Sequence, residues 1–409
     1  MVVLIPIIHH YQLRFAVETY IAELKAKGEP MDLAQVIPPR IPAEMNSAPR
    51  FLAAVSLFAT NENVLTTNWP IGMRGVAPGK AQILWQQNFI RDFGMTNSWG
   101  DLALALEADK EAFNRLAAIT NSSLFDFDLQ YFRRSEMLLT HLTLEKKTAQ
   151  KLAAKAICDL RSGNAESAAK EIQIMLSLVE GTHDERTAIS QLVRLAITQI
   201  ACATTWELLQ STNLTDGQLA ELQGDWSRPE FLQAMACVLP VERECGQTAA
   251  ASWRSSTKEL LRILDLSKKA GEAMGLDTAD EGVFDKIKMR GEIFLWRYWW
   301  SYPDELRGLR GYQALMDTMK LAATNGPFQE ALAKQGLALD QLGISKIDGS
   351  FQTMFSGRPD FHNMYAESIV TLAGLPGKVL RAETARQTVI AALALKRFQL
   401  KHGIYSKLY

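Results

Sequence analysis

Residues 165–179 have the sequence AESAAKEIQIMLSLV, and this stretch indicates the fold class. Its apolar residues recur at intervals of three and four positions, which places them on one face of an α-helix. Asn164 before it is a good N-cap, and Gly163 is a typical stop for a preceding helix. The sequence therefore predicts a helix that packs one face against its neighbours. The apolar positions are Ala165, Ala168, Ala169, Ile172, Met175, Leu176 and Val179.

The helical pattern continues on both sides of this stretch. Residues 136–160 carry an apolar face that is formed by Leu142, Ala149, Leu152, Ala153, Ala156 and Leu160. Residues 185–210 are apolar nearly all round, which is typical of a helix that is buried on most sides, and we expect this helix at the centre of the array. Its narrow polar stripe consists of Gln191, Arg194, Thr198 and Thr205.

Helical signals cover most of the remaining chain. No stretch shows the two-residue alternation of a strand bounded by hairpin turns, so no substantial sheet is expected. The predicted fold class is all-α: an irregular array of antiparallel helices, solenoid-like or a bundle, without a strict repeat. Further helices are expected at residues 11–27, 50–58, 81–93, 101–118, 216–222, 228–238, 241–274, 284–298, 304–323, 327–335, 361–372 and 378–402.

Proline and glycine positions divide the chain into three segments. We expect an N-terminal helix in residues 1–28, an irregular segment with short helices and loops in residues 29–125, and the helical array in residues 126–409. A chain of 409 residues is long enough for two or three domains or for one elongated array.

The first eight residues, MVVLIPII, are wholly apolar and run directly into His9, His10 and Tyr11. A helix needs about 20 residues to cross a bilayer, and the stretch lacks the basic region and cleavage site of a secretory signal. Two interpretations remain: a short buried segment, or the remnant of a membrane anchor. The aromatic and histidine residues that follow favour the anchor, because such residues mark the ends of membrane spans.

The composition restricts the function classes. The 44 basic and 45 acidic residues nearly cancel, so no nucleic-acid partner is expected. Hydrophobic residues make up 47% of the chain and charged residues 22%, which argues against extensive disorder and against a multi-span membrane protein. No C-x-x-C pair occurs, so zinc-ribbon and thioredoxin-like sites are disfavoured and the cysteines are expected to be packing residues. They are Cys158, Cys202, Cys237 and Cys245.

Three motifs invite a functional interpretation and have simpler explanations. Gly75–Ala81 has one residue too few for a phosphate-binding loop and lacks its hydroxyl residue, so we interpret it as a turn before a helix. Asp184 and Glu185, between His183 and Arg186, fit the N-cap and first turn of the next helix. His141 lies beside apolar helix positions and is expected to be a packed histidine. The sequence thus names no catalytic residue, no cofactor and no metal site.

The tryptophan-rich run 294–302, FLWRYWWSY, is the best candidate for a binding surface. Trp296, Trp299 and Trp300 fall at positions i, i+3 and i+4 and would share one face of a regular helix. Such a face either fills a helix junction or, if exposed, binds a ligand or a membrane surface. Both interpretations stay open at this point.

Four further segments stand out: MRGVAPGKAQILWQQ (73–87), ISQLVRLAITQIACATTWELLQ (189–210), LTDGQLAELQGDW (214–226) and ARQTVIAALALKRFQLKHGIY (385–405). Together they resemble an uncharacterised family of helical bacterial proteins that is abundant in planctomycete and verrucomicrobial genomes. The resemblance covers most of the chain. Because members of this family typically begin with one membrane-spanning helix, it implies an anchor in the cell envelope, and it brings no activity and no catalytic residues.

The last of these segments also looks like the end of a pseudopilin helix. Leu395, Phe398, Leu400, Gly403 and Tyr405 match the pseudopilin pattern, whereas Ser406 stands where proline is expected.

The sequence favours a non-catalytic scaffold or interaction protein at the bacterial cell envelope, with protein partners and with membrane association through the N-terminal anchor. The alternative is an enzyme that acts on envelope material at a site near Trp296–Trp300. Two or more carboxylates or histidines with shifted pKa values in a deep pocket would favour the enzyme. A shallow aromatic surface would favour binding.

Overall fold

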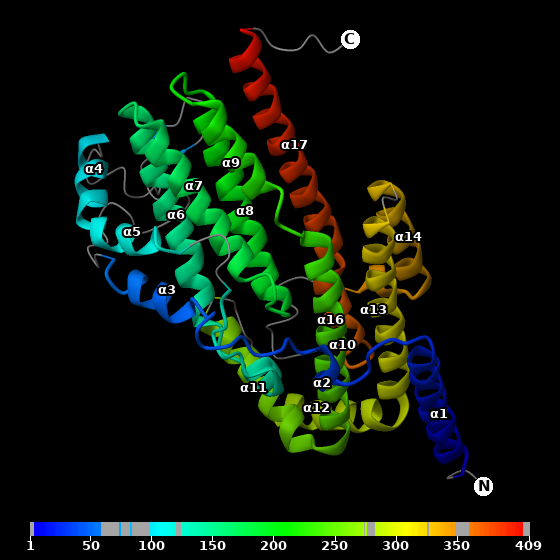
Figure 1. Cartoon of the computed structure of the whole chain (residues 1–409). Coiled ribbons are helices and arrows are strands. Elements are labelled where there is room, and N and C mark those ends of the chain that lie inside the picture. The colour runs from blue at the N-terminus through cyan, green and yellow to red at the C-terminus, as the bar shows by residue number, and fades with distance from the viewer. Residues whose placement is uncertain are drawn as a thin grey trace. The chain divides into compact units, whose positions relative to one another are not determined.

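A computed structural model describes residues 4–58, 73–74, 82–83, 99–119, 124–273, 275, 283–324, 327–347 and 360–403. These residues are almost entirely helical, and the predicted all-α class is confirmed (Figure 1). The strands among them are β1 (Met73–Arg74) and β2 (Gln82–Ile83), which form one short antiparallel pair. Strand β2 lies where a helix was predicted at residues 81–93, and the rest of that prediction falls outside the described residues.

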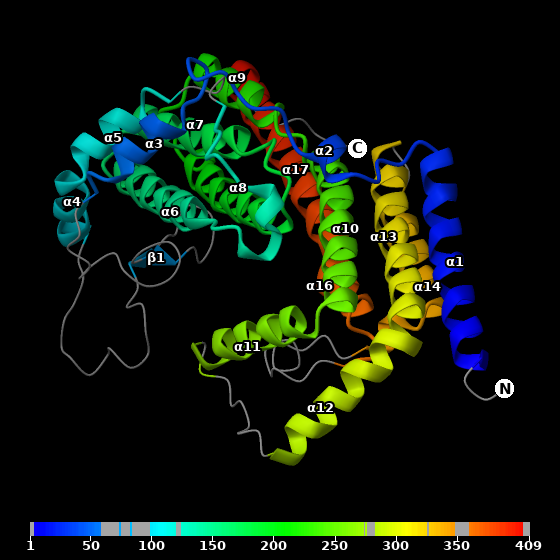
Figure 2. The same ribbon diagram turned by 90° about the horizontal axis from the view of Figure 1, so that it is seen from below.

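The chain forms two compact units, each of which combines distant parts of the sequence. The first unit contains residues 1–37, 186–188 and 235–377, and the second contains residues 38–185, 189–234 and 378–409. This division differs from the predicted boundary at residue 125. Long-range packing is the reason, because α4 (Trp99–Ala108) contacts α6 (Thr140–Arg161) across residue 125. The N-terminal helix α1 (Leu4–Ala26), which was predicted as a separate segment, packs along α13 (Ser301–Ala323) (Figures 1 and 2).

Helices α6 (Thr140–Arg161) and α7 (Ala165–Gly181) pack closely against each other in the second unit. The predicted turn between them is confirmed: Gly163 adopts a left-handed φ of 81°, and the Asn164 side chain accepts a hydrogen bond from the Ser167 amide. The other elements of the unit are α3 (Ala48–Val55), α4 (Trp99–Ala108), α5 (Lys110–Leu116), η2 (Tyr131–Glu136), α8 (Ala188–Leu209), α9 (Asp216–Trp226) and most of α17 (Leu375–His402).

Helix α8 is largely buried, as predicted, but its polar stripe is buried with it. Gln191, Arg194 and Thr198 are at most 3% exposed, and the residues that do face solvent include Ile189 and Gln199. Among the described helices, α8 is the one whose length and composition could fit a membrane span, and 61% of its apolar window is buried in the protein. A core helix has the same length and composition.

The first unit is built around α13. Its buried residues Tyr312, Leu315 and Met319 face the core, and Gly308 lets the Tyr365 ring pack directly on the helix backbone. The other elements are α2 (Leu33–Val36), most of α10 (Phe231–Ser255), α11 (Thr257–Ala273), α12 (Val283–Leu295), the π-helical turn η3 (Trp296–Trp300), α14 (Phe328–Gln341), η4 (Ile344–Lys346) and α16 (Ala366–Ala373).

Helix α10 corrects a predicted boundary. The sequence predicts separate helices at residues 228–238 and 241–274, because Pro240 removes a backbone donor. In the structure α10 continues through Pro240 and ends at Ser255. The residues around the proline, Val238, Leu239 and Val241, are at most 2% exposed, so their packing offsets the lost hydrogen bond.

Candidate functional site

The structure separates Trp299 from the other two tryptophans of the predicted binding surface. Trp296 is completely buried in a core cluster with Leu260 and Ile293, and the partly buried Trp300 packs against the same cluster. The Trp300 ring also lies 3.7 Å from the His362 ring, measured between centroids, whereas Trp299 is 37% exposed. The wider π-helical turn η3 explains this separation, because residue i+3 rotates away from the face that residues i and i+4 still share. The packing interpretation thus fits Trp296 and Trp300, and the three residues do not form one exposed face.

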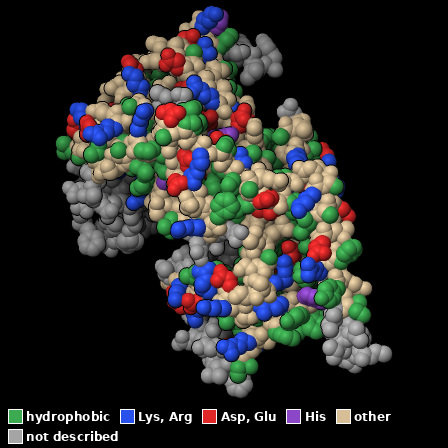
Figure 3. Space-filling view, turned by 60° about the horizontal axis from the view of Figure 1, so that its bottom comes forward, with side chains coloured by type: hydrophobic (Ala, Val, Ile, Leu, Met, Phe, Trp, Pro, Cys, Tyr) green, Lys and Arg blue, Asp and Glu red, His purple; other side chains and the backbone are tan. Residues whose placement is uncertain are grey.

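Trp299 nevertheless belongs to a broad exposed apolar surface on the first unit. Figure 3 shows apolar side chains gathered at the lower right of the view. We call this the aromatic surface and define it by the large exposed residues of α1, α12 and η3. These are Ile8, Tyr11, Phe15, Ile287, Phe294, Leu295, Tyr298 and Trp299.

His10 joins the two halves of the aromatic surface. Its Nδ1 donates a hydrogen bond to the Tyr298 carbonyl over 3.0 Å, and its ring contacts the rings of Tyr298 and Tyr302. The Phe294 and Tyr298 rings lie 4.8 Å apart, so the exposed side of α12 and η3 continues directly to α1. The sequence run 294–302 identified the second half of this surface. The contribution of α1 could not be predicted, because it depends on a contact across 288 residues.

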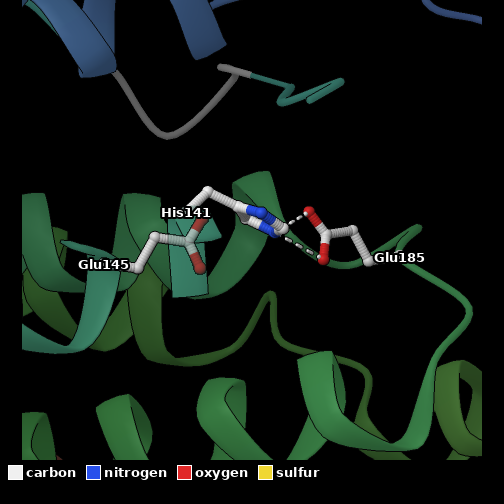
Figure 4. A group of neighbouring side chains, drawn as sticks. All are labelled: His141, Glu145 and Glu185. Atoms are coloured by element: carbon white, nitrogen blue, oxygen red, sulfur yellow. Dashed lines mark hydrogen bonds and ion pairs between the residues drawn. The ribbon is translucent and has the colours of Figure 1, made fainter. Parts of the chain in front are cut away.

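A second candidate site is a buried polar cluster in the second unit. His141, Glu145 and Glu185 are 4%, 1% and 5% exposed, and one ligand atom from each lies within 4.8 Å of the other two. Figure 4 shows the three side chains converging, with His141 between the two carboxylates. His141 Nε2 lies 2.9 Å from Oε1 of Glu185 and 3.1 Å from its Oε2.

The cluster is assembled by one helix and one turn. His141 and Glu145 are one turn apart on α6 and therefore share a face. Glu185 comes from the turn between α7 and α8, which Gln191 holds in place by donating its Nε2 hydrogens to carbonyls of the turn, the closest being that of Glu185 at 2.8 Å. Phe127 stacks on the His141 ring with 4.1 Å between centroids and fixes its plane.

The environment of the cluster disfavours the state in which Glu145 and Glu185 are both ionised. Burial, followed by the repulsion from Glu185, raises the pKa of Glu145 well above its ordinary value. Oε1 of Glu145 has no hydrogen-bond partner although it is buried. A buried acceptor without a partner is rare in proteins and calls for a proton, an ion or a water at that position.

The sequence interpretation missed this cluster for two reasons. His141 was expected to be a packed histidine, although Glu145 stands at i+4 on the same helix face, which was the available signal. Asp184 and Glu185 were expected to start the next helix. That prediction is wrong, because α8 begins at Ala188 and Glu185 turns inward to His141.

A pocket of about 340 Å³ lies elsewhere in the second unit, at the ends of α4, α6 and α8. Trp99 and Arg161 line this pocket, and the Arg161 guanidinium lies 4.4 Å from the centroid of the Trp99 ring. Glu207 contributes a carboxylate to the lining. Its remaining lining consists of apolar and uncharged polar residues. The pocket therefore lacks the set of several carboxylates or histidines that would favour an enzyme.

Comparison with known proteins gives no guide to the identity of this chain. None of the protein-family models matches it, and the comparisons with curated proteins and with solved structures return no match. The resemblance of four segments to a helical bacterial family stays a prediction, and the functional argument depends on the two sites described above.

Proposed function

We propose that the protein is a non-catalytic interaction protein that lies on a lipid membrane surface and binds it through the aromatic surface of α1, α12 and η3. The observation that carries the proposal is the gathering of exposed Phe, Tyr, Trp and Ile side chains on adjacent helices. Of these, Phe15 is 70% exposed, Tyr11 61% and Phe294 57%. Monomeric proteins seldom expose large contiguous apolar patches without an interaction partner.

The residue types favour a membrane over a protein as the partner. Tyr298 and Trp299 combine an apolar ring with a polar group, and such residues prefer the interface between lipid headgroups and acyl chains. Residues 283–300, which form α12 and η3, contain four basic and two acidic residues. Of the basic residues, Arg297 is turned inward to the Trp253 carbonyl and Lys288 pairs with Glu292. This positive excess beside an apolar face is typical of helices that lie flat on an anionic bilayer.

A bacterial cell envelope is the location that fits this proposal, since it offers an anionic membrane surface. Apart from Ile8, the residues of the aromatic surface lie outside residues 1–8, so the proposal does not depend on whether those residues belong to an anchor. The alternative of an enzyme near Trp296–Trp300 stays a prediction, because no described feature of the aromatic surface favours catalysis.

Vesicle binding tests the proposal. The purified chain is sedimented with vesicles of phosphatidylglycerol and phosphatidylcholine, and separately with vesicles of phosphatidylcholine alone. We expect binding to the anionic vesicles and weaker binding to the neutral ones. The variant F294S/W299S should bind anionic vesicles at least about tenfold more weakly, because it removes two large apolar side chains from the bilayer contact.

The matched control is L104S/F132S, which removes two side chains that are 73% and 64% exposed on the second unit. This variant should bind vesicles like the unchanged protein. Equal loss of binding in both variants would contradict the proposal. The proposal would also be contradicted if the chain did not bind vesicles but formed a dimer in sedimentation velocity that F294S/W299S abolished. The partner of the aromatic surface would then be a second copy of the chain.

A further inference from the structure

We infer that His141, Glu145 and Glu185 form a binding site for a divalent transition-metal ion, best matched by Zn²⁺, which ties the start of α6 to the turn before α8. This inference is independent of the proposed membrane function, since the three residues belong to the second unit. It arises from an imidazole and two carboxylates that converge in the protein interior (Figure 4).

The strongest single observation is the unpartnered oxygen of Glu145. This side chain is 1% exposed and its Oε1 has no hydrogen-bond partner, while one of its carboxylate oxygens lies within 4.8 Å of ligand atoms of His141 and Glu185. Leaving such an acceptor without a partner costs about 1–3 kcal/mol, and more when the group is charged. A cation at the centre of the cluster would satisfy it.

Charge balance leads to the same conclusion. The described ion-pair partner of Glu185 is His141, a single group that carries at most one positive charge, whereas the two glutamates together carry two negative charges when ionised. A divalent ion neutralises both carboxylates at once and leaves His141 as a neutral ligand.

The distances are compatible with metal coordination. Two ligand atoms that are each about 2.1 Å from one ion lie about 3.0–3.4 Å apart at tetrahedral to octahedral angles. His141 Nε2 is 2.9 and 3.1 Å from the two Glu185 oxygens, close to this spacing. The ion would take the place of the proton between Nε2 and Glu185, and that proton would leave to solvent. Glu145 closes the remaining gap by rotating its carboxylate.

The donor set selects the kind of ion. One imidazole nitrogen and two carboxylates suit Zn²⁺ and neighbouring first-row ions, whereas Ca²⁺ and Mg²⁺ prefer oxygen ligands alone. Surrounding contacts resemble the supporting shell of a metal site, because Phe127 fixes the imidazole plane and Gln191 fixes the turn that carries Glu185. Three protein ligands leave one position of a tetrahedral Zn²⁺ ion for water.

Calorimetric titration of the chelator-treated chain with ZnCl₂ tests the inference, and the visible absorption of added Co²⁺ reports the coordination geometry. We expect one ion per chain with the intense bands of tetrahedral Co²⁺. The variants E145Q and E185Q each remove one ligand charge with little change in shape. Both should weaken Zn²⁺ binding by more than about tenfold, and Zn²⁺ should no longer raise their melting temperature.

The control variant is E171Q. Glu171 is also a buried glutamate of the α6–α7 pair, but its carboxylate already binds Lys155 over 2.8 Å. We expect E171Q to bind Zn²⁺ like the unchanged chain. The inference is overturned if the unchanged chain binds none of Zn²⁺, Mn²⁺ and Co²⁺ at micromolar concentration, which would mean that a proton balances the cluster. It is equally overturned if E145Q and E185Q retain full binding, because the ion would then sit elsewhere.

Discussion

His141 Nε2 lies 2.9 Å from Oε1 of Glu185, and 44 residues separate the two in the chain. Both side chains are buried, so this contact takes the place of the hydrogen bonds that each group makes with water in the unfolded chain. It fixes the turn between α7 and α8 to the first turn of α6. The stability of the second unit should therefore depend on a polar contact in its interior.

Replacement of His141 by alanine tests that dependence. Without the imidazole, the buried carboxylates of Glu145 and Glu185 lose their compensating partner. We expect the free energy of unfolding of the chelator-treated chain to fall by about 3–5 kcal/mol, measured by urea unfolding. The control is H183A, at a neighbouring and less buried histidine, which should change stability by less than about 1 kcal/mol. If the two variants lowered the free energy of unfolding equally, the buried contact would contribute no more to stability than the less buried histidine.

Arg194 provides a second test of buried polar groups. Its Nε donates to the Val179 carbonyl at the end of α7 over 2.6 Å, and its Nη2 donates to Glu180 over 3.3 Å. Burial lowers the pKa of Arg194 to about 10, so the group stays charged at neutral pH. Arg194→Met should destabilise the chain by about 2–4 kcal/mol, because a buried carbonyl loses its donor.

The matched variant for this prediction is Arg397→Met. Arg397 binds Asp216 at the surface over 2.7 Å, and exposed pairs contribute about 0–1 kcal/mol. Thermal and urea unfolding of the two variants should therefore differ clearly. Similar stabilities would refute the role assigned to Arg194.

Much of the fold could be predicted because its signals are local. Asn164 caps the N-terminus of α7, and Gly163 is the left-handed residue of the turn between α6 and α7. Gly28 follows α1 and also has a φ of 81°. These positions depend on the backbone preferences of single residues. Pro240 shows the limit of such signals, because the packing of its apolar neighbours keeps α10 intact across it.

The sites were less predictable because they depend on contacts between distant segments. The polar stripe of α8 is buried, since Gln191 and Arg194 find carbonyl partners in the end of α7 and the turn after it. No periodicity in the sequence reveals those partners. Likewise, the π-helical turn that separates Trp296 from Trp299 breaks the spacing rule by which the residues were grouped.

The close approach of Tyr365 to α13 predicts opposite effects for two glycine substitutions. A Cβ atom on Gly308 would lie 1.9 Å from Cδ1 of Tyr365, whereas a Cβ on Gly336 would have no neighbour within 4 Å. Gly308→Ala should destabilise the chain by more than about 2 kcal/mol through overpacking. Gly336→Ala, at an exposed position of α14, should stabilise it by about 0.5–1 kcal/mol. Thermal unfolding that gave both variants the same sign would contradict this packing.

Asp304 predicts a pH dependence of stability. Its carboxylate accepts hydrogen bonds from the amides of Tyr365 and Ala366, but burial outweighs them and raises its pKa from 3.8 to about 6. The folded chain then binds more protons than the unfolded chain between these values. Stability from this group is therefore present below pH 3.8 and is lost as the pH rises to about 6, by about 3 kcal/mol in total.

The variant D304N isolates this contribution. Urea unfolding between pH 4 and pH 7 should show a decline for the unchanged chain that is smaller in D304N. Parallel curves for the two proteins would mean that the pKa of Asp304 is not raised in the folded chain.

Hydrogen exchange with and without anionic vesicles tests the membrane-surface function most directly. Peptides that cover residues 8–15 and 287–299 should exchange more slowly when vesicles of phosphatidylglycerol and phosphatidylcholine are present, because the bilayer would cover both helices of the aromatic surface. Unchanged exchange in both segments, or protection confined to the second unit, would contradict the proposed function.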